Sequence, residues 1–350
     1  MSNIISIGLP RRPNLTQRQT LALENFVSHR RTASDVYWLK ENAELLNVLA
    51  SSGARLPETA LAPLAGFYAG LEERLRFFPQ YYRFLLSMCL DLEDLGMPGQ
   101  TGEALCDSVA NSGAVEAELS DLQRAEARYL LSRRGFGTAD PALDGRLDQF
   151  AHRSATFALP NKKAAYELTH LVFYRSDYGR RPIAADAALA TSLEFAGLLA
   201  FLDQDVDLLA EVCVALRFAG VPPSDIWEDW LTGQLHSFVQ EPAAPGSFHD
   251  AYHEFLVTSW WSLLRGDTGF TGIVKIGPMA IRRAVAPAGP LRAMSECMYH
   301  LGANRLCDWS RMRRFISDAL GAEGHEILEG AERSSDRFDE FFQRFARAER

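Results

Sequence analysis

The sequence has few cysteines, and their arrangement does not suggest a cross-link or a zinc ribbon. The five cysteines of the 350-residue chain stand apart, and none forms a C-x-x-C pair. Dispersed single cysteines are typical of a reducing compartment. The opening MSNIISIGLPRRPN lacks the apolar run of a signal peptide, and no stretch of about 18 uncharged apolar residues follows it. We therefore expect a cytoplasmic protein of bacterial or organellar type that does not span a membrane.

A surplus of basic residues is also missing. Lys and Arg number 36 against 45 Asp and Glu, for a net charge of −9. Proteins that bind nucleic acids or acidic membrane surfaces neutralise phosphates with Lys and Arg, so neither partner is expected. The chain has no Walker loop, no G-x-G-x-x-G after a strand, no G-x-S-x-G elbow and no H-E-x-x-H. Nothing in the sequence therefore supports phosphoryl transfer, nicotinamide chemistry or acyl hydrolysis.

What the sequence does contain is helical periodicity along most of its length. With 47% hydrophobic residues, the chain can bury a large core, and we expect one domain over residues 1–350, with a possible division into 1–155 and 156–350. Only Ile4–Leu9 and Ile273–Ile276 look like strands. The connections are short, so successive helices should pack as antiparallel hairpins. The predicted fold is all-α, an irregular α/α toroid or solenoid of such hairpins.

The expected helices are separated mostly by glycine and proline. They cover residues 16–30, 34–51, 57–75, 79–95, 101–111, 113–134, 140–155, 160–178, 185–203, 205–219, 223–239, 247–265, 289–302, 308–320 and 325–348.

The segment AAYELTHLVFYRSDYGR, residues 164–180, is the most informative part of the chain. At about 100° per residue, one face of this helix is apolar, whereas Glu167, His170, Tyr174 and Asp177 lie on another. Such side chains are costly to bury unless they are hydrogen-bonded or bound to a metal or a ligand. The pattern therefore indicates where a site should lie.

Two acid-x-x-His pairs indicate metal binding. Glu167 precedes His170 by three residues, and Asp250 precedes His253 by the same spacing. Residues three apart are neighbours on a helix, and carboxylate-bridged di-iron bundles use this pair. With Asp205 as a further carboxylate, these four residues are the candidate ligands of a divalent metal, namely Zn, Fe or Mn. The alternative is that the histidines belong to the core and are satisfied by hydrogen bonds. A complete di-metal site needs more carboxylates, for which the chain offers Glu194, Asp207 and Glu211.

Several of these residues also have a purely structural interpretation. Asp177 lies two turns beyond His170, too far along the axis to share its metal, and suits proton transfer together with Tyr174 or the orientation of Arg180 or Arg181. Alternatively, Asp177 and Gly179 simply end the helix. Asp205 begins a helix in the acidic turn DQDVD, where capping is an alternative to metal binding.

The strings YELTHLVFYRSDYGRR and FLDQDVDLLAEVCVALRFAG, with Tyr252–His253 after them, carry a resemblance to known sequences. This part of the chain, about residues 160–260, resembles a bacterial all-α family of unknown function and helical proteins found near natural-product pathways. The resemblance implies that Thr169, His170, Asp177, Asp205 and His253 recur together. It implies no activity.

Two functions remain open from the sequence. In the first, the chain is a metal-dependent enzyme in which His170 and His253 meet in a helix-lined pocket that takes a small molecule. In the second, it is a helical scaffold or adaptor, and the polar residues form a buried network that fixes helix register. The amphipathic segment 325–348 should dock on the body of the protein or on a partner subunit, which would give a homo-oligomer.

Overall fold

The computed structural model describes residues 13–244, 249–272, 275–284 and 287–348, and most of them are helical. The prediction of an all-α protein is confirmed, since the described residues add only one antiparallel pair of short strands, β1 (Phe238–Pro242) and β2 (Met279–Arg283). Neither was predicted. The expected strand at 4–9 lies outside the described residues, as do positions 273 and 274, and Lys275 and Ile276 are not in a strand.

Helix boundaries in the first half of the chain are as follows. The helices are α1 (Leu15–Asn25), a π-helical turn (Phe26–Arg30), α2 (Val36–Ser51), α3 (Glu58–Leu61), α4 (Ala65–Ala69), α5 (Leu71–Phe77), α6 (Tyr82–Asp94), α7 (Thr101–Ala110), α8 (Asp121–Ser132), α9 (Pro141–Ala151), α10 (Ser154–Phe157) and α11 (Lys162–Arg175). Short 3₁₀ turns lie at Ala62–Leu64 and Pro79–Tyr81.

The second half continues with larger buried helices and a C-terminal group. The helices are α12 (Ala187–Leu202), α13 (Val206–Phe218), α14 (Asp225–Ser237), α15 (Tyr252–Arg265), α16 (Leu291–Leu301), α17 (Trp309–Asp318), α18 (Ala322–Ser334) and α19 (Phe338–Phe345), with a 3₁₀ turn at Gly302–Asn304.

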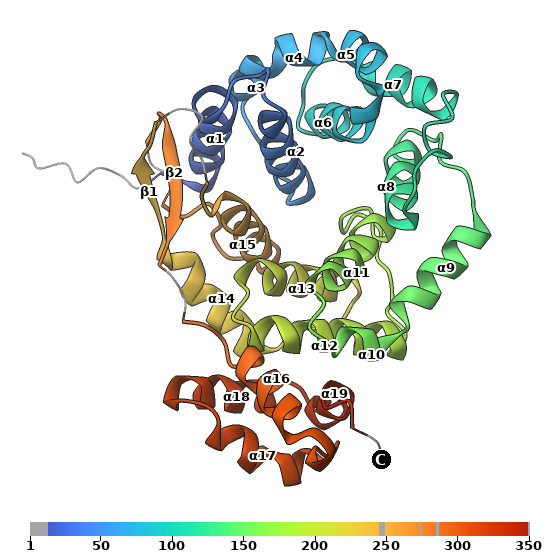
Figure 1. Ribbon diagram of the computed structural model, residues 1–350. Coiled ribbons are helices and arrows are strands. Elements are labelled where there is room, and N and C mark those ends of the chain that lie inside the picture. Colours follow the sequence, from blue (N-terminus) through green and yellow to red (C-terminus); the bar gives the residue numbers. More distant parts are fainter. Residues whose placement is uncertain (1–12, 245–248, 273–274, 285–286, 349–350) are drawn as a thin grey trace, which may run out of the picture.

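Six helices surround the centre of the molecule, and we call them the inner ring (Figure 1). In chain order they are α2, α6, α8, α11, α13 and α15, and each contacts the next until α15 returns to α2. The remaining helices before α16 lie outside them in Figure 1. Many consecutive helices are in contact, among them α6 with α7 and α12 with α13, as expected for hairpins. Side chains of the inner ring are thereby brought towards one centre from distant parts of the sequence.

Side-chain caps explain why many helix starts were predicted within one or two residues. Asp205 and Asn161, for example, precede α13 and α11, and their side chains accept hydrogen bonds from the third amide that follows (Leu208 and Ala164). Such caps satisfy amides that have no partner within the helix. The capping alternative for Asp205 is therefore the observed one.

Several predicted helices are shorter or broken: the one at 57–75 is divided into α3, α4 and α5, and the one at 247–265 begins only at Tyr252. Two further cases show the physical cause. The segment expected to be helical from 113 begins only at Asp121, after turns that include Gly113 at φ 72° and end at the capping side chain of Ser120. The expected helix 325–348 is divided at Ser335, whose extended backbone separates α18 from α19. The hydroxyl of Ser335 accepts the amide of Arg337 and donates to Glu194 of α12. A break that is stabilised by a contact to another helix leaves no local sequence signal.

The last four helices form a group that packs against the outside of the ring (Figure 1). Within it, α18 contacts α12 and α14, and α19 contacts α10 and α12. The rings of Phe341 and Phe195 pack edge to face, 5.7 Å apart. The amphipathic C-terminal segment thus docks on the body of its own chain, one of the two expected outcomes. The homo-oligomer stays a prediction.

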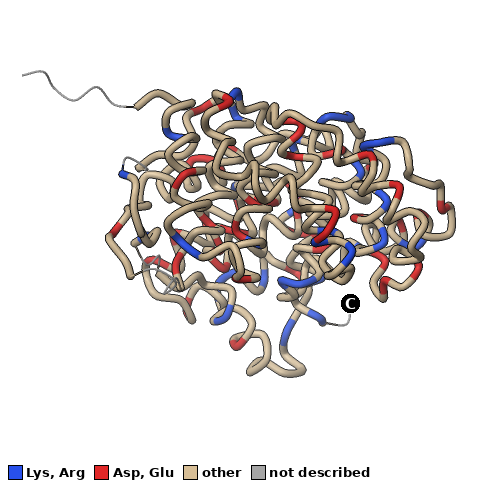
Figure 2. Tube along the Cα trace, turned by 90° about the horizontal axis from the view of Figure 1, so that it is seen from above, with Lys and Arg blue, Asp and Glu red and all other residues tan. Residues whose placement is uncertain are grey.

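Charges of both signs are interspersed over the view in Figure 2, where no basic face stands out. None of the helices in the described part of the chain is both long and apolar enough to cross a bilayer.

A buried arginine connects the first helices to the sheet. Arg30 donates through Nε to Glu41 (2.9 Å), and its two terminal nitrogens donate to Asp250 (2.8 and 3.0 Å). Nη1 also reaches the carbonyl oxygen of Met279 in β2, and the amide of Ile281 donates to Asp250. All three charged side chains are at most 1% exposed. Removal of the arginine would therefore leave Asp250 buried without its counter-charge, whereas Glu41 would keep its ion pair with Arg31 at 2.6 Å.

We expect Arg30→Met to lower the free energy of unfolding by about 3–5 kcal/mol, because breaking a buried ion pair leaves charges without compensation. Urea denaturation measures this. The control is Arg292→Met, which removes the pair with Glu296, whose side chains are 88% and 56% exposed. The control should change stability by less than about 0.5 kcal/mol. Equal effects of the two substitutions would contradict this account of Arg30.

Candidate metal centre

Two carboxylates on α13 lie at the centre of the candidate site. Asp207 and Glu211 are one helical turn apart, and most other residues of α13 are buried and apolar. The helix packs between α11, α12 and α15. The side chain of Glu211 is only 3% exposed and that of Asp207 18%. Carboxylates in such a position need hydrogen bonds or opposite charges, and α11 and α15 provide them.

Asp207 is held from both neighbouring helices. Its Oδ1 lies 2.8 Å from Nδ1 of His253 on α15, and its Oδ2 accepts the hydroxyl of Tyr166 on α11 at 2.8 Å. Although burial opposes ionisation, these hydrogen bonds and the charge of His253 hold the pKa of Asp207 below its ordinary value. Asp207 is thus a carboxylate at neutral pH.

Glu211 is held by two consecutive residues of α11. The hydroxyl of Thr169 donates to Oε2 of Glu211 at 2.6 Å, and Nδ1 of His170 lies 3.6 Å from the same oxygen. Nδ1 of His170 also bonds to the carbonyl oxygen of Tyr166 at 2.7 Å, which fixes the ring. Burial raises the pKa of Glu211 above its ordinary value. His170 and His253 therefore converge on two carboxylates that are neighbours on one helix.

Glu44 of α2 closes the group from the opposite side. Its Oε1 lies 3.9 Å from Nε2 of His253, and its Oε2 is buried without a hydrogen-bond partner among the described residues. Burial raises the pKa of Glu44. We call Glu44, His170, Asp207, Glu211 and His253 the central cluster. Four of the six inner-ring helices contribute to it.

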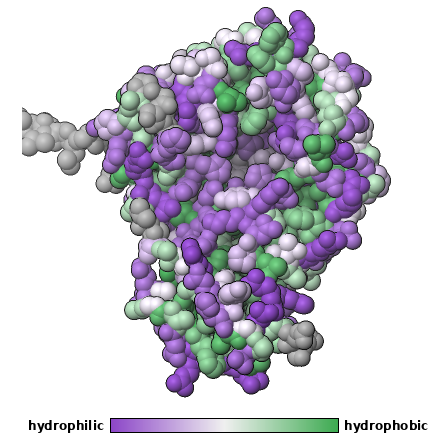
Figure 3. Space-filling view, viewed as in Figure 1, coloured by the Kyte–Doolittle hydropathy of each residue, from purple (hydrophilic) through white to green (hydrophobic). Residues whose placement is uncertain are grey.

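The central cluster is open to solvent in part. His170 and His253 are 35% and 33% exposed, and Glu44 is 25% exposed, although all three lie on inner-ring helices. Figure 3, in the orientation of Figure 1, shows the molecule hollowed near the centre of the ring, with hydrophilic residues gathered there. A small solute can therefore approach the histidines.

The arrangement suits a metal ion. Asp207, Glu211 and His253 each offer one ligand atom, and these atoms lie within 4.8 Å of one another. Carboxylate and imidazole ligands bind Zn, Fe and Mn with bonds near 2 Å, so small rotations of the side chains would bring all three into one coordination shell. The hydrogen bonds from Tyr166 and Thr169 are of the kind that orient metal-binding carboxylates. The buried Oε2 of Glu44, which has no hydrogen-bond partner among the described residues, is a further oxygen on a side chain that lies beside His253.

Of the five predicted metal ligands, the structure brings only His170 and His253 into this cluster. Glu167 lies 3.8 Å from Lys163, one turn earlier on the same helix. Asp205 caps α13 and pairs with Lys162 at 2.8 Å. Asp250 forms the ion pair with Arg30. Its spacing to His253 was misleading because α15 begins only at Tyr252, so the two residues do not share a helix face.

Asp207, Glu211 and Glu44 were not among the predicted ligands, although Asp207 and Glu211 were noted as available carboxylates. The usable signal was their i, i+4 spacing on an otherwise apolar helix, VDLLAEVCVALRF. For Glu44 no local signal exists, because its proximity to His253 depends on the contact between α2 and α15.

The two predicted catalytic residues differ in position. Tyr174 is near the cluster: its ring centroid lies 6.0 Å from that of His170 and stacks on Tyr129 at 5.7 Å. Burial raises the pKa of Tyr174 well above its ordinary value, so its hydroxyl stays protonated. Asp177 instead lies beyond the end of α11, where it pairs with Arg180 at 3.4 Å. The structure thus places Asp177 where it can orient Arg180, and its part in proton transfer stays a prediction.

The sequence SDYG forms an unusual turn after α11. Asp177, Tyr178 and Gly179 all have left-handed backbone angles, with φ of 50°, 50° and 84°. The turn places the ring of Tyr178 against Tyr129 and Trp260, at 5.4 and 5.8 Å. A Cβ at residue 179 would lie 2.3 Å from the ring of Phe218. Only glycine fits this position without strain.

We expect Gly179→Ala to lower the free energy of unfolding by about 1–3 kcal/mol, because it adds a strained left-handed residue and a clash. The control is Gly145→Ala in α9, where an added Cβ meets nothing within 4 Å. That change should raise stability by about 0.5–1 kcal/mol. Chemical denaturation of both variants measures the contrast, and a stabilising Gly179→Ala would refute the packing argument.

His253 should make the stability of the metal-free protein depend on pH. Burial disfavours its charged form, but the hydrogen bond to Asp207 and the charges of Asp207, Glu44 and Glu211 raise the pKa of His253 from 6.5 to about 10. The stability that this provides is complete below pH 6.5 and is lost as the pH rises through about 10.

In chelator, the free energy of unfolding should thus fall between pH 6.5 and 10, and His253→Gln should flatten that fall. An unchanged slope in the variant would mean that His253 is not the titrating group.

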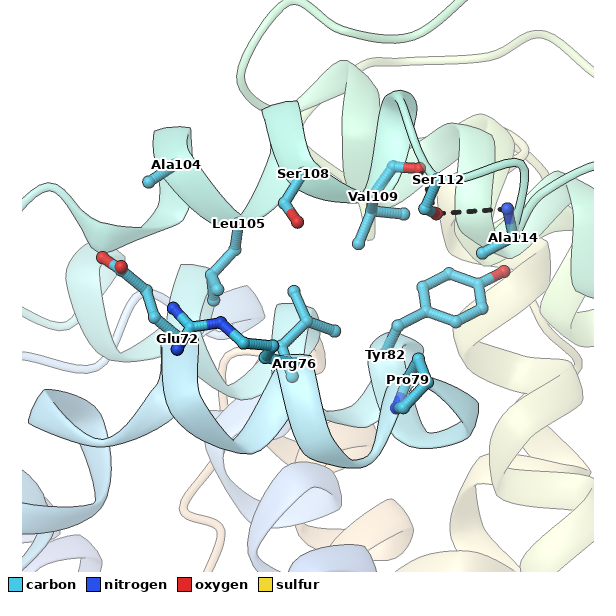
Figure 4. Close-up of a pocket in the computed structure, with 11 residues that line it drawn as sticks. Glu72, Arg76, Pro79, Tyr82, Ala104, Leu105, Ser108, Val109, Ser112 and Ala114 are labelled. Carbon is cyan, nitrogen blue, oxygen red and sulfur yellow. Dashed lines mark hydrogen bonds between the residues drawn. The ribbon is translucent and has the colours of Figure 1, made fainter.

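A cavity of about 260 Å³ lies away from the central cluster, between α5, α6 and α7 (Figure 4). Glu72 and Arg76 line one part of it, and Tyr82, Ser108 and Ser112 another. None of the predicted site residues lines it. Its lining has no cysteine or histidine, so it is a weaker candidate for metal chemistry than the central cluster.

Comparison with known proteins identifies a family. The chain belongs to the family described as "Domain of unknown function (DUF6902)", which matches residues 1–348. No curated protein and no solved structure matches the chain. The prediction of a family of unknown function is therefore confirmed.

Proposed function

Because membership of this family assigns no activity, we propose from the geometry that the protein is a metal-dependent enzyme acting on a small molecule. The metal would be a divalent ion held at the centre of the inner ring by Asp207, Glu211 and His253. The observation that carries the proposal is the approach of their three ligand atoms to within 4.8 Å of one another. In this proposal the closed cycle of inner helices and the helices outside it form an irregular α/α toroid with the site at its centre.

Zn, Fe and Mn are the metals that this donor set favours. Two carboxylates would compensate the charge of a divalent ion, and Glu44 and His170 flank the three ligands. Metal binding requires His253 to lose a proton, so metal affinity should rise with pH. When bound, such an ion polarises a substrate oxygen or lowers the pKa of a bound water.

The chain's own residues would bind and orient the substrate. Tyr174 is protonated at neutral pH and makes no hydrogen bond through its hydroxyl among the described residues, so it can donate to a polar group of the substrate. The ring of Tyr178 packs beside that of Tyr174, with centroids 6.2 Å apart, and Phe173 and Trp260 pack on Tyr178, so the surroundings of Tyr174 are apolar. A small molecule with an apolar part and a polar reacting group fits this combination.

A structural role for the central cluster is the second candidate. The raised pKa of His253 means that an imidazolium compensates the carboxylates without a metal. The network would then join α11, α13 and α15, and the protein would be a scaffold whose function lies on its outer surface. Metal content separates the two candidates.

Protein purified without chelator should contain about one Zn, Fe or Mn per chain, measured by elemental analysis. His253→Ala and Asp207→Asn each remove a ligand, so metal content should fall at least about tenfold in each. Tyr166→Phe removes only a hydrogen bond to Asp207 and should weaken metal affinity by about 10–100-fold.

The matched control is His152→Ala. His152 lies 3.1 Å from Asp186 on the surface. The substitution therefore removes a histidine–aspartate pair outside the cluster and should leave the metal content unchanged. A metal-free wild type whose melting temperature is the same in chelator would refute the metal site and favour the scaffold.

A further inference from the structure

A cavity separate from the central cluster lies where the C-terminal helices meet the ring. Its volume is about 330 Å³, and we call it the junction pocket. Small-molecule pockets in proteins begin at about 300 Å³, so a ligand of modest size fits. Its walls come from α11, α12, α13 and α16, and the lining side chains are mainly apolar. These are Ala165, Leu199, Ala200, Leu208 and Leu291.

The two walls of the junction pocket are held at a fixed separation. Gly289, just before α16, is packed so closely against the end of α12 that an added Cβ would lie 2.1 Å from the carbonyl oxygen of Leu202. The start of α16 is therefore in contact with α12. The pocket is part of the folded structure rather than a gap between loosely associated parts.

One polar atom in the pocket has no partner. The hydroxyl of Ser295 on α16 is buried and makes no hydrogen bond within the described residues. A serine in a helix usually bonds to a carbonyl of the preceding turn, and a buried hydroxyl without any partner is costly. Ser295 lines the pocket, so a change of its side-chain rotamer would let the hydroxyl bond to a ligand there.

Each charged side chain at the rim is already in an ion pair, and the five together carry one net negative charge. Lys162 lies 2.7 Å from Asp203 and 2.8 Å from Asp205, and Arg292 lies 2.9 Å from Glu296. A charged ligand would lose hydration on entering the apolar lining and find no free counter-charge. The pocket therefore favours a neutral ligand.

We propose that the junction pocket binds a neutral small molecule, mostly apolar, with a single hydrogen-bonding group directed at Ser295. This site lies apart from the central cluster, although both use α11 and α13: Ala165 and Leu208 line the pocket, and the adjacent Tyr166 and Asp207 belong to the metal site. The proposal does not depend on metal binding, and its test uses metal-free or metal-loaded protein equally.

Four benzene derivatives test the proposed chemistry on the full chain: toluene, benzyl alcohol, benzoate and benzylammonium, with binding followed by calorimetry or ligand-detected NMR. Toluene and benzyl alcohol should bind saturably at one site. Benzoate and benzylammonium should bind at least about tenfold more weakly, because each carries a charge into an apolar lining. The absence of saturable binding by the neutral compounds, or tighter binding by a charged one, would overturn the proposal.

Variants locate the site. Ser295→Ala should weaken the binding of benzyl alcohol about fivefold, since one hydrogen bond is lost, and leave the affinity for toluene unchanged. Ala165→Leu fills the pocket and should abolish binding of both. Because it can also disturb packing, Ser295→Leu provides a second filling variant on the less buried wall. Ser108→Ala, in the cavity of Figure 4, is the matched control and should change the affinity for neither toluene nor benzyl alcohol. Binding that survives both filling variants would place the ligand elsewhere and refute the proposal.

Discussion

The hydrogen bond between His253 and Asp207 links α15 to α13, and the centre of the ring depends on it. Helix α13 is enclosed by α11, α12 and α15, yet it carries two carboxylates. Those carboxylates are tolerated only because α11 supplies two hydroxyl donors and α15 supplies an imidazole. The same contacts determine how the helices face one another. The hydrogen bonds that stabilise the buried carboxylates therefore also hold the inner ring closed.

Much of the fold followed from local sequence. Glycine and proline punctuation and the capping side chain of Asp205 placed many helices correctly, since these signals act within one turn of the helix end. The errors lie where a distant contact decides. Ser335 breaks the last helix while bonded to Glu194, and β1 forms only because β2, some forty residues later, pairs with it.

The site was predictable only in part, for the same reason. His170 and His253 were chosen as the histidines of two acid-x-x-His pairs, and the structure brings both to α13. The acid-x-x-His spacing failed because it assumes that both residues belong to one helix, whereas Asp250 precedes α15 and is taken by Arg30. Glu167 is on the correct helix but faces Lys163. The carboxylates that meet the histidines come from α13 and α2, and only tertiary packing reveals them.

The central cluster is therefore either a metal site or a network in which a protonated His253 compensates the charge of the carboxylates. In the first case the imidazole of His253 binds the metal, and in the second it carries a proton. Anomalous diffraction from crystals of protein purified without chelator, collected on both sides of the absorption edge of the metal found, decides between them. Our account predicts a single anomalous peak about 2.0–2.3 Å from oxygens of Asp207 and Glu211 and a nitrogen of His253. No peak there, with His253 still bonded to Asp207, would contradict it.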